Sequence, residues 1–440
     1  MRGKATQGIG YNEHIIFIEF IHRIKIQGDL YMKAVGLVTE YNPFHNGHLY
    51  HMMQSIEQTN ANYTICVVSG NFVQRGNTSI IDKWTKAEMA LKGGADLVIE
   101  LPTVYSVSSA ENFAEGAVKL LNSLGIVDNI AFGMEAKDIS LLNNIATVLY
   151  QEPKEYITIL NHELSKGISF PKARENAVMI YLNDIKKYIN VMTSSNNILA
   201  IEYLKALKKL RSTMYPVGIP REKVLYNDEF IVDDFASATA IRRMITRGEY
   251  EEIRKVMPKF SYNLLANSVN QGKYVIDLAI FQKEILYILR KMTVDEIAQL
   301  PDVSEGLENA IKNASDSCNN LMDFISIVKS KRYTQTRIQR ILVYALLGIT
   351  KKDMEISKKV TPYIRILGVS NRGKSLISEI SKMNNNIPVI TSVKKFITES
   401  KNKNLKRLLQ IDINATDIYT LGYLKDSCAN LDYTQKIITL

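Results

Sequence analysis

Residues 38–51 of the chain read VTEYNPFHNGHLYH, and this run decides the fold. It follows the apolar residues 34–38 and precedes a helical pattern over residues 47–59. A strand, a tight turn and a helix are therefore predicted in succession. The first turn of a helix presents unpaired backbone N–H groups and the positive end of the helix dipole. The run thus predicts an anion site where a strand turns into a helix.

Two histidines three residues apart, His45 and His48, stand at the start of the predicted helix. Side chains at this spacing lie on one face of a helix, so both imidazoles can donate hydrogen bonds to the same phosphate. Gly47 between them lets a phosphate approach the backbone closely. Fixed donors of this kind suit nucleotidyl transfer, in which negative charge develops at the α-phosphate of a nucleotide.

Two other roles for these histidines stay open at this point. They can simply cap the helix, or they can bind a metal ion together with His51, which follows at the same spacing. A zinc protease helix carries a Glu between its histidines, and zinc sites commonly include Cys. No Glu stands between these histidines and no Cys is near them, so the sequence favours a phosphate site and no metal site.

The run resembles the HxGH signature of a nucleotidyltransferase superfamily, and its surroundings are more specific. From residue 32 to the C-terminus, the chain is similar to the bacterial tRNA(Met) cytidine acetate ligase family. The motifs that carry this resemblance are VSGNFVQRG at 68–76, GADLVIELP at 94–102, FGME at 132–135, SNNILAIEY at 195–203 and SATAIR at 237–242. These motifs, found together and in this order, identify the family much more specifically than HxGH alone.

The resemblance implies a catalytic role for His45 and His48, which would stabilise charge at the α-phosphate of ATP. The residues expected to bind ATP are Val38, Thr39, Glu40, Tyr41, Asn42, Pro43, Phe44, His45, Asn46, Gly47, His48, Leu49, Tyr50, His51, Gly133, Asn196, Asn197, Arg221 and Arg242. The sequence leaves open which of Asn196 and Asn197 contacts the nucleotide. Arg221 follows Pro220 where the family usually has Lys, which weakens its assignment. Arg242 ends a motif whose Ser and Thr can cap a helix, and its planar guanidinium can reach phosphates.

Strands and helices alternate in the first half of the chain, which predicts βαβ units and a parallel sheet. The expected strands are 34–38, 63–68, 97–100 and 129–132, with helices at 47–59, 83–92 and 110–124. The expected fold class is α/β: a Rossmann-like HxGH nucleotidyltransferase domain with ligand loops at the carboxyl edge of its sheet.

The chain is expected to divide into three parts. Residues 32–249 would form the nucleotidyltransferase-like catalytic domain, and residues 250–440 a mainly helical, basic tRNA-binding domain. Residues 1–31 precede Met32, where the chain of the resembling family normally begins. The expectation is that these residues are a non-native or disordered N-terminal extension.

Positive charge is concentrated near the C-terminus. Residues 331–440 hold 20 Lys and Arg against 8 Asp and Glu, a net charge of +12. The first 330 residues hold 35 Lys and Arg against 37 Asp and Glu, a net charge of −2. Segregated charge of this kind is an electrostatic footprint for a polyanion. The residues expected to contact tRNA are Arg75, Lys83, Arg337, Arg340, Arg372 and Lys374. For Arg75 and Lys83, which follow the second strand, a role in binding acetate is the alternative.

Residues 368–375 read GVSNRGKS, which formally fits a nucleotide-binding P-loop. A P-loop opens a large parallel-sheet domain, but only 65 residues follow Ser375. We therefore expect a basic turn on the RNA-facing surface instead.

The function that the resemblance implies has two steps. Acetate would attack ATP to give acetyl-adenylate, and N4 of the wobble cytidine of elongator tRNA(Met) would then take the acetyl group. ATP is a substrate here, and Mg²⁺ would accompany its phosphates. The alternatives are a small-molecule adenylyltransferase and a non-catalytic RNA-binding protein on the same fold.

The composition agrees with a cytoplasmic enzyme that does not enter a membrane. The three cysteines are far apart in the sequence and odd in number, which predicts a reducing compartment and no disulfide framework. No apolar run approaches the length of a membrane span.

Overall fold

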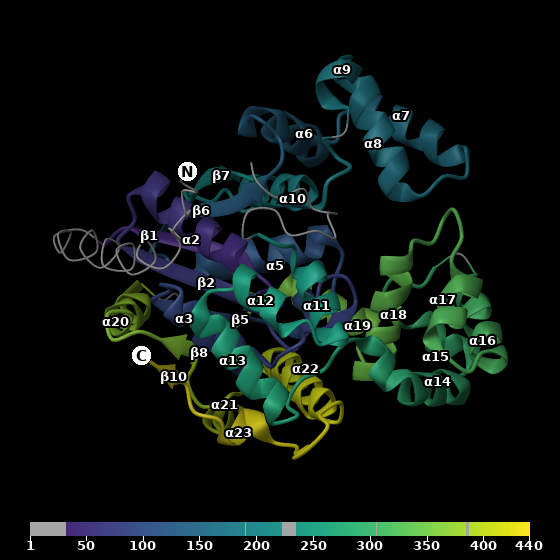
Figure 1. The fold of residues 1–440 in the computed structure, drawn as a ribbon. Helices are drawn as coiled ribbons and strands as arrows, with labels where there is room; N and C mark the ends of the chain where they lie inside the picture. The colour runs from purple at the N-terminus through teal and green to yellow at the C-terminus, as the bar shows by residue number, and fades with distance from the viewer. Residues whose placement is uncertain (1–31, 190, 222–234, 305, 384–386) are drawn as a thin grey trace, which may run out of the picture.

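A computed structural model describes residues 32–189, 191–221, 235–304, 306–383 and 387–440. The expectation for residues 1–31 lies outside this part of the chain. An eight-stranded sheet forms the centre of the molecule, with strand order β10-β8-β5-β2-β1-β6-β7 and β9 paired to β8. Helices cover both of its faces (Figure 1). The expected α/β fold is confirmed.

Five parallel strands make up the nucleotidyltransferase part of the sheet. They are β1 (Ala34–Thr39), β2 (Tyr63–Ser69), β5 (Leu97–Leu101), β6 (Val127–Met134) and β7 (Tyr215–Pro220). The first four agree with the predicted strands, whereas β7 was not expected. Because the strands are parallel, the loops after β1, β2, β5 and β6 lie at one edge of the sheet, as predicted.

Residues of these strands alternate between two hydrophobic cores. On β2, Ile65 and Val67 belong to one core and Cys66 and Val68 to the other. A parallel sheet that is covered on both faces buries both sets of side chains. The helices of this region are α2 (Asn46–Thr59), α3 (Lys83–Lys92), α5 (Ala110–Ser123), α6 (Ile139–Gln151), α10 (Ser195–Lys209), α11 (Ala238–Arg247), α12 (Tyr250–Val256) and α13 (Lys259–Asn270).

Helices α5 and α10 pack together against one face, and α3 packs on β2, β5 and β8 from the other. Gly36 in β1 permits close packing, because a Cβ at this position would lie 2.8 Å from Leu121 of α5. A two-stranded hairpin, β3 (Phe72–Val73) and β4 (Asn77–Thr78), follows β2 at the ligand edge.

The C-terminal region is mainly helical, as expected, but it also completes the central sheet. Strands β8 (Ile364–Val369), β9 (Val389–Ile390) and β10 (Ile438–Thr439) extend the sheet beyond β5. The expected boundary at residue 250 therefore does not separate two independent sheets or cores. The helices of the C-terminal region are α14 (Gln282–Lys291), α16 (Leu307–Ser317), α17 (Leu321–Val328), α18 (Gln335–Leu347), α19 (Lys351–Lys359), α20 (Lys374–Met383), α21 (Val393–Glu399), α22 (Lys403–Thr420) and α23 (Leu431–Thr434).

The P-loop-like segment joins β8 to α20 at the far edge of the sheet. β8 runs antiparallel to β5, with Val369 opposite Leu97 at the start of β5. The turn packs against the chain: Ser370 N donates to Asp96 O, and a Cβ on Gly373 would lie 1.9 Å from that oxygen. This turn is therefore not a phosphate cradle, and it lies on the opposite edge from His45.

Candidate active site

The predicted strand-to-helix turn lies between β1 and α2, with His45 as the N-cap of the helix. The backbone N–H of Gly47 donates to His45 Nδ1 at 3.0 Å, and the backbone N–H of His45 donates to His48 Nδ1 at 3.3 Å. The two imidazoles stack, with ring centroids 3.8 Å apart. The caps use only one nitrogen of each ring. Capping and ligand binding are therefore compatible, although they were alternatives at the level of the sequence.

These contacts determine where the ring protons sit. In a neutral imidazole, one nitrogen accepts and the other carries the proton. Because each Nδ1 accepts a backbone N–H, each Nε2 must carry the hydrogen and act as a donor. Burial lowers the pKa of His45 to about 3 and that of His48 well below its usual value, and the Arg221 charge adds to both shifts. Both rings are therefore neutral Nε2–H donors near pH 7.

His51 supplies a third imidazole one turn further along α2. Burial and the Arg221 charge lower its pKa to about 4. Its Nε2 is buried and has no hydrogen-bond partner among the residues that the structure describes. Three neutral imidazoles thus lie along one side of the helix start.

Two arginines reach the same turn. Arg242, on α11, donates from Nη1 to Asn42 O at 2.8 Å and from Nη2 to Thr239 Oγ1 at 3.1 Å. Its helix begins as the sequence predicted, with Ser237 Oγ accepting Ala240 N–H. Arg221 follows β7 and lies against Gly133, where a Cβ would be 3.4 Å from Arg221 Cδ. The motifs after β1, β6 and β7 therefore meet α11 at one edge of the sheet.

The two adjacent asparagines have different roles. Asn197 is buried, and its Oδ1 accepts the backbone N–H groups of Glu135 at 2.9 Å and Ala136 at 3.0 Å. Asn196 donates from Nδ2 to the Glu135 carboxylate at 2.6 Å, and Ser194 Oγ also bonds that carboxylate. Both residues thus fasten the start of α10 to the end of β6. Glu135 lies within the FGME motif, but nothing in the sequence indicates that its carboxylate bonds Ser194 and Asn196.

Part of the HxGH run packs behind the histidines. Tyr41 and Phe44 are fully buried, and their ring centroids lie 5.1 and 5.9 Å from that of His48. Asn42 Oδ1 accepts Ile80 N–H at 2.8 Å, and Leu49 is buried in the core. These contacts indicate that Tyr41, Phe44, Asn42 and Leu49 hold the histidines in position.

Two of the expected tRNA contacts, Arg75 and Arg337, come together beside the carboxyl edge of the sheet. Arg75 is exposed in the turn between β3 and β4. The next residue, Gly76, has a positive φ of 73° and packs on α18, where a Cβ would lie 2.3 Å from Arg340 N. Arg337 of α18 stacks over Tyr333 and donates to Asp302 O at 2.8 Å. These two assignments stay predictions.

Two other expected tRNA contacts are wrong. Lys83 is fully buried and pairs with Glu100 at 3.0 Å and with Asp432 at 2.8 Å. Arg340 is also buried and pairs with Asp302 at 2.9 Å. A buried side chain that is paired with a carboxylate does not present its charge to RNA. Arg372 and Lys374 are partly or fully exposed, but they lie at the far edge of the sheet.

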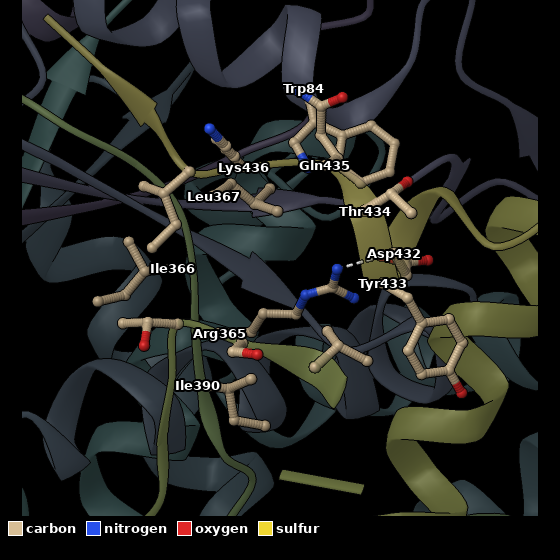
Figure 2. A pocket seen from close by; sticks show the side chains of 14 residues that line it. Trp84, Arg365, Ile366, Leu367, Ile390, Asp432, Tyr433, Thr434, Gln435 and Lys436 are labelled. Carbon is tan, nitrogen blue, oxygen red and sulfur yellow. Dashed lines mark hydrogen bonds and ion pairs between the residues drawn. The ribbon is translucent and has the colours of Figure 1, made fainter. Parts of the chain in front are cut away.

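The partners of Lys83 belong to a buried charge cluster that ties the C-terminal segment to the sheet. Figure 2 shows Arg365 of β8 pointing toward Asp432 beside a cavity of about 200 Å³. Arg365 also pairs with Glu100 at 3.0 Å. β5 and β2 separate β8 from β1, so this cavity lies apart from the HxGH turn.

Two kinds of feature are absent from the described part of the chain. Its histidines, cysteines and acidic residues do not gather in groups of three that could hold a metal ion. None of its helices has both the length and the apolar character that are needed to cross a membrane.

Comparison with known proteins agrees with this arrangement. A family model described as HIGH Nucleotidyl Transferase matches residues 32–434. The tRNA(Met) cytidine acetate ligase of Caldanaerobacter subterraneus subsp. tengcongensis is 44% identical over 409 residues, which cover 93% of this chain and 100% of that protein. The chain belongs to the tRNA(Met) cytidine acetate ligase family. A tRNA(Met) cytidine acetate ligase of Thermoanaerobacter sp. is 46% identical over 413 residues, with the same coverage.

Solved structures of the tRNA(Met) cytidine acetate ligase family share the fold. The apo structure of Thermotoga maritima TmcAL is 35% identical and has a TM-score of 0.89, covering 93% of this chain and 100% of that one. A second crystal form of that protein is bound with alpha-thio ATP; it is 34% identical and has a TM-score of 0.86 with the same coverage. The Thermotoga protein thus binds an ATP analogue.

Proposed function

We propose that this protein activates acetate with ATP and transfers the acetyl group to N4 of the wobble cytidine of elongator tRNA(Met), forming N4-acetylcytidine. The observation that carries the proposal is the pair of neutral Nε2–H donors on His45 and His48 at the strand-to-helix turn. Both rings are oriented by backbone hydrogen bonds. Membership of the ligase family supports the choice of acetate and tRNA.

In the first step, an acetate oxygen attacks the α-phosphorus of ATP, and the bond to the bridging oxygen of pyrophosphate breaks. Negative charge increases on the α-phosphate oxygens, and donors that are oriented in advance stabilise it without reorganisation. His45 and His48 would supply those donors. Arg242 would hold the leaving pyrophosphate, since a guanidinium can donate two parallel hydrogen bonds to phosphate oxygens.

In the second step, the exocyclic amine of the cytidine attacks the acetyl carbonyl of the mixed anhydride. AMP leaves, and the amine loses one proton. Carboxylate is a poor acyl donor and AMP a good leaving group, so forming the anhydride first makes the transfer feasible. The exposed Arg75 beside α18 would guide the anticodon toward the cleft, because phosphate contacts position a nucleic acid.

Mg²⁺ would be held by the phosphates of ATP rather than by a cage of protein carboxylates. The cytoplasm, where tRNA is processed in bacteria, is the expected compartment.

An acetate-dependent exchange of labelled pyrophosphate into ATP, measured without tRNA, tests the first step. The proposal predicts exchange with acetate in the wild-type protein. An adenylyltransferase for another small molecule would exchange only with its own acceptor, and a non-catalytic RNA-binding protein would show no exchange with any acceptor. Either of these results would contradict the proposal.

A further inference from the structure

Glu135 lies where several elements of the ligand edge meet. It directly follows β6, which lies between β1, the strand before the HxGH turn, and β7, the strand before Arg221. The two preceding residues contact that arginine: a Cβ on Gly133 would be 3.4 Å from Arg221 Cδ, and Met134 O accepts Arg221 N–H at 3.0 Å. The Arg221 charge in turn acts on the three imidazoles of the site. Glu135 is therefore next to the proposed nucleotide site.

The Glu135 carboxylate binds the start of α10. Ser194 Oγ donates to one carboxylate oxygen, and Asn196 Nδ2 donates to the other at 2.6 Å. The backbone is fixed as well, because the N–H of Glu135 donates to Asn197 Oδ1 at 2.9 Å. Glu135 is thus attached to one helix start through both its backbone and its side chain.

These bonds determine which way the Asn196 amide faces. A carboxylate only accepts hydrogen bonds, so the part of the amide next to Glu135 must be its NH₂ group. The carbonyl oxygen, Oδ1, then faces elsewhere, and within the described ranges the structure records no hydrogen bond to it. Asn196 is only partly buried, whereas Asn197 is buried and uses its Oδ1 for two backbone N–H groups. Asn196 is therefore the member of the pair that can meet a ligand.

We propose that Glu135 is a positioning residue of the ATP site, which holds the Asn196 amide so that its Oδ1 accepts a hydrogen bond from the nucleoside part of ATP. The inference rests on the proposed function and adds a residue to its nucleotide site. Phosphate oxygens are acceptors, so a fixed acceptor does not suit them. The ribose hydroxyls and the adenine amino group are donors, and Oδ1 would bind one of these. Without Glu135, the amide would be free to rotate about χ2 and to present its NH₂ group instead.

A double-mutant cycle on ATP affinity tests this coupling. In isothermal titration without acetate or tRNA, Glu135→Ala and Asn196→Ala should each raise the Kd for ATP about five- to tenfold, the scale of one lost hydrogen bond. The double variant should also stay at about tenfold, because both changes remove the same bond. Glu135→Gln should stay within about twofold, since its Oε1 can accept from Asn196 while its Nε2 donates to Ser194. Glu115→Ala, which removes a carboxylate bonded to Lys209 in the last turn of α10, is the matched control.

An isosteric exchange replaces the cycle if Glu135→Ala fails to fold. Asn196→Asp alone sets two carboxylates against each other and should raise the Kd for ATP by about tenfold or more. Adding Glu135→Gln to that variant supplies an NH₂ donor for the new carboxylate. The exchanged pair should return the Kd to within about threefold of the wild-type value, since one hydrogen bond again fixes the acceptor. No recovery in the exchanged pair would contradict the inference.

The outcomes separate the inference from the proposed function. If the wild-type protein exchanges pyrophosphate with acetate but Glu135→Ala keeps its Kd for ATP, the inference is wrong and the function stands. Losses that multiply in the double variant would show that Glu135 acts independently of Asn196. A lower Tm with an unchanged Kd would assign Glu135 a structural role, and either result contradicts the inference. If the cycle shows the coupling but acetate supports no exchange, the inference stands and the function is wrong.

Discussion

The imidazoles of His45 and His48 stack 3.8 Å apart, and each holds its ring orientation by accepting a backbone N–H within the same helical turn. The Nδ1 atoms accept these backbone hydrogen bonds, so the ring hydrogens are carried by the Nε2 atoms. The two residues that cap the helix are therefore also the two that we propose as donors to the α-phosphate.

Replacing His48 with Ala removes one of these donors. Loss of a single preorganised donor to a developing negative charge costs about 100- to 1,000-fold in kcat. We expect acetate-dependent pyrophosphate exchange to fall by that factor while tRNA binding, measured by filter retention, is retained. His162→Ala, which changes a histidine that is 71% exposed on α7 (Lys154–Ser165), is the control. Exchange equal to that of the wild type would remove the proposed role of His48.

Arg242→Lys keeps the charge near the histidines but loses the planar fork. A charge-assisted hydrogen bond contributes about 1.5–3 kcal/mol, so we expect ATP to bind about 10- to 100-fold more weakly by isothermal titration. Arg247→Lys, in the last turn of the same helix, changes an exposed arginine that is far along the helix from Asn42. An unchanged dissociation constant for ATP in Arg242→Lys would rule out the phosphate contact.

Acid should destabilise the protein through its buried histidines. The unfolded-state pKa of His is about 6.5, whereas burial lowers the pKa of His45 to about 3 and that of His51 to about 4. Below about pH 6.5 the unfolded chain binds protons that the folded chain does not, so the free energy of unfolding falls as pH decreases. We expect a lower Tm at pH 5 than at pH 7.

The matched variant for this pH dependence is His45→Asn. Asn is a favoured N-cap residue, so the start of α2 is retained while one titrating group is lost. The Tm of this variant should decline less between pH 7 and pH 5. A decline in Tm as steep as that of the wild type would show that His45 does not contribute to the acid destabilisation.

The buried pair of Lys83 and Glu100 should matter far more for stability than an exposed pair on the same helix. Removing one partner of a buried pair costs about 3–5 kcal/mol because the other charge stays buried. Lys83→Ala should therefore lower the free energy of unfolding by about that amount in urea titrations. Lys92→Ala breaks an exposed pair with Glu88 and should cost about 0–1 kcal/mol. Equal effects of the two variants would contradict the burial of Lys83.

The parts of the fold that were predictable depend on local patterns. The strand, turn and helix around His45 follow from periodicity and capping residues that lie within the same run, and so does the start of α11 at Ser237. Strand β8 was not expected, because it pairs antiparallel with β5 across more than half of the chain. No local pattern specifies a partner at that distance.

The errors in the candidate site have the same origin. The helix that begins at Lys83 was expected, but a lysine that follows a polar stretch is typical of an exposed helix start, whereas Lys83 is fully buried. Its partner Asp432 lies near the other end of the chain. The role of Asn197 was also hidden, because its backbone partners belong to β6 and not to its own helix.

Nucleoside analysis of elongator tRNA(Met) after incubation with labelled acetate and ATP tests the central claim most directly. We predict labelled N4-acetylcytidine at the wobble position, with AMP and pyrophosphate as the other products. A transcript whose wobble cytidine is replaced by uridine should take up no label. Absence of acetylcytidine from the unmodified tRNA, under conditions in which the protein binds ATP and that tRNA, would contradict the account.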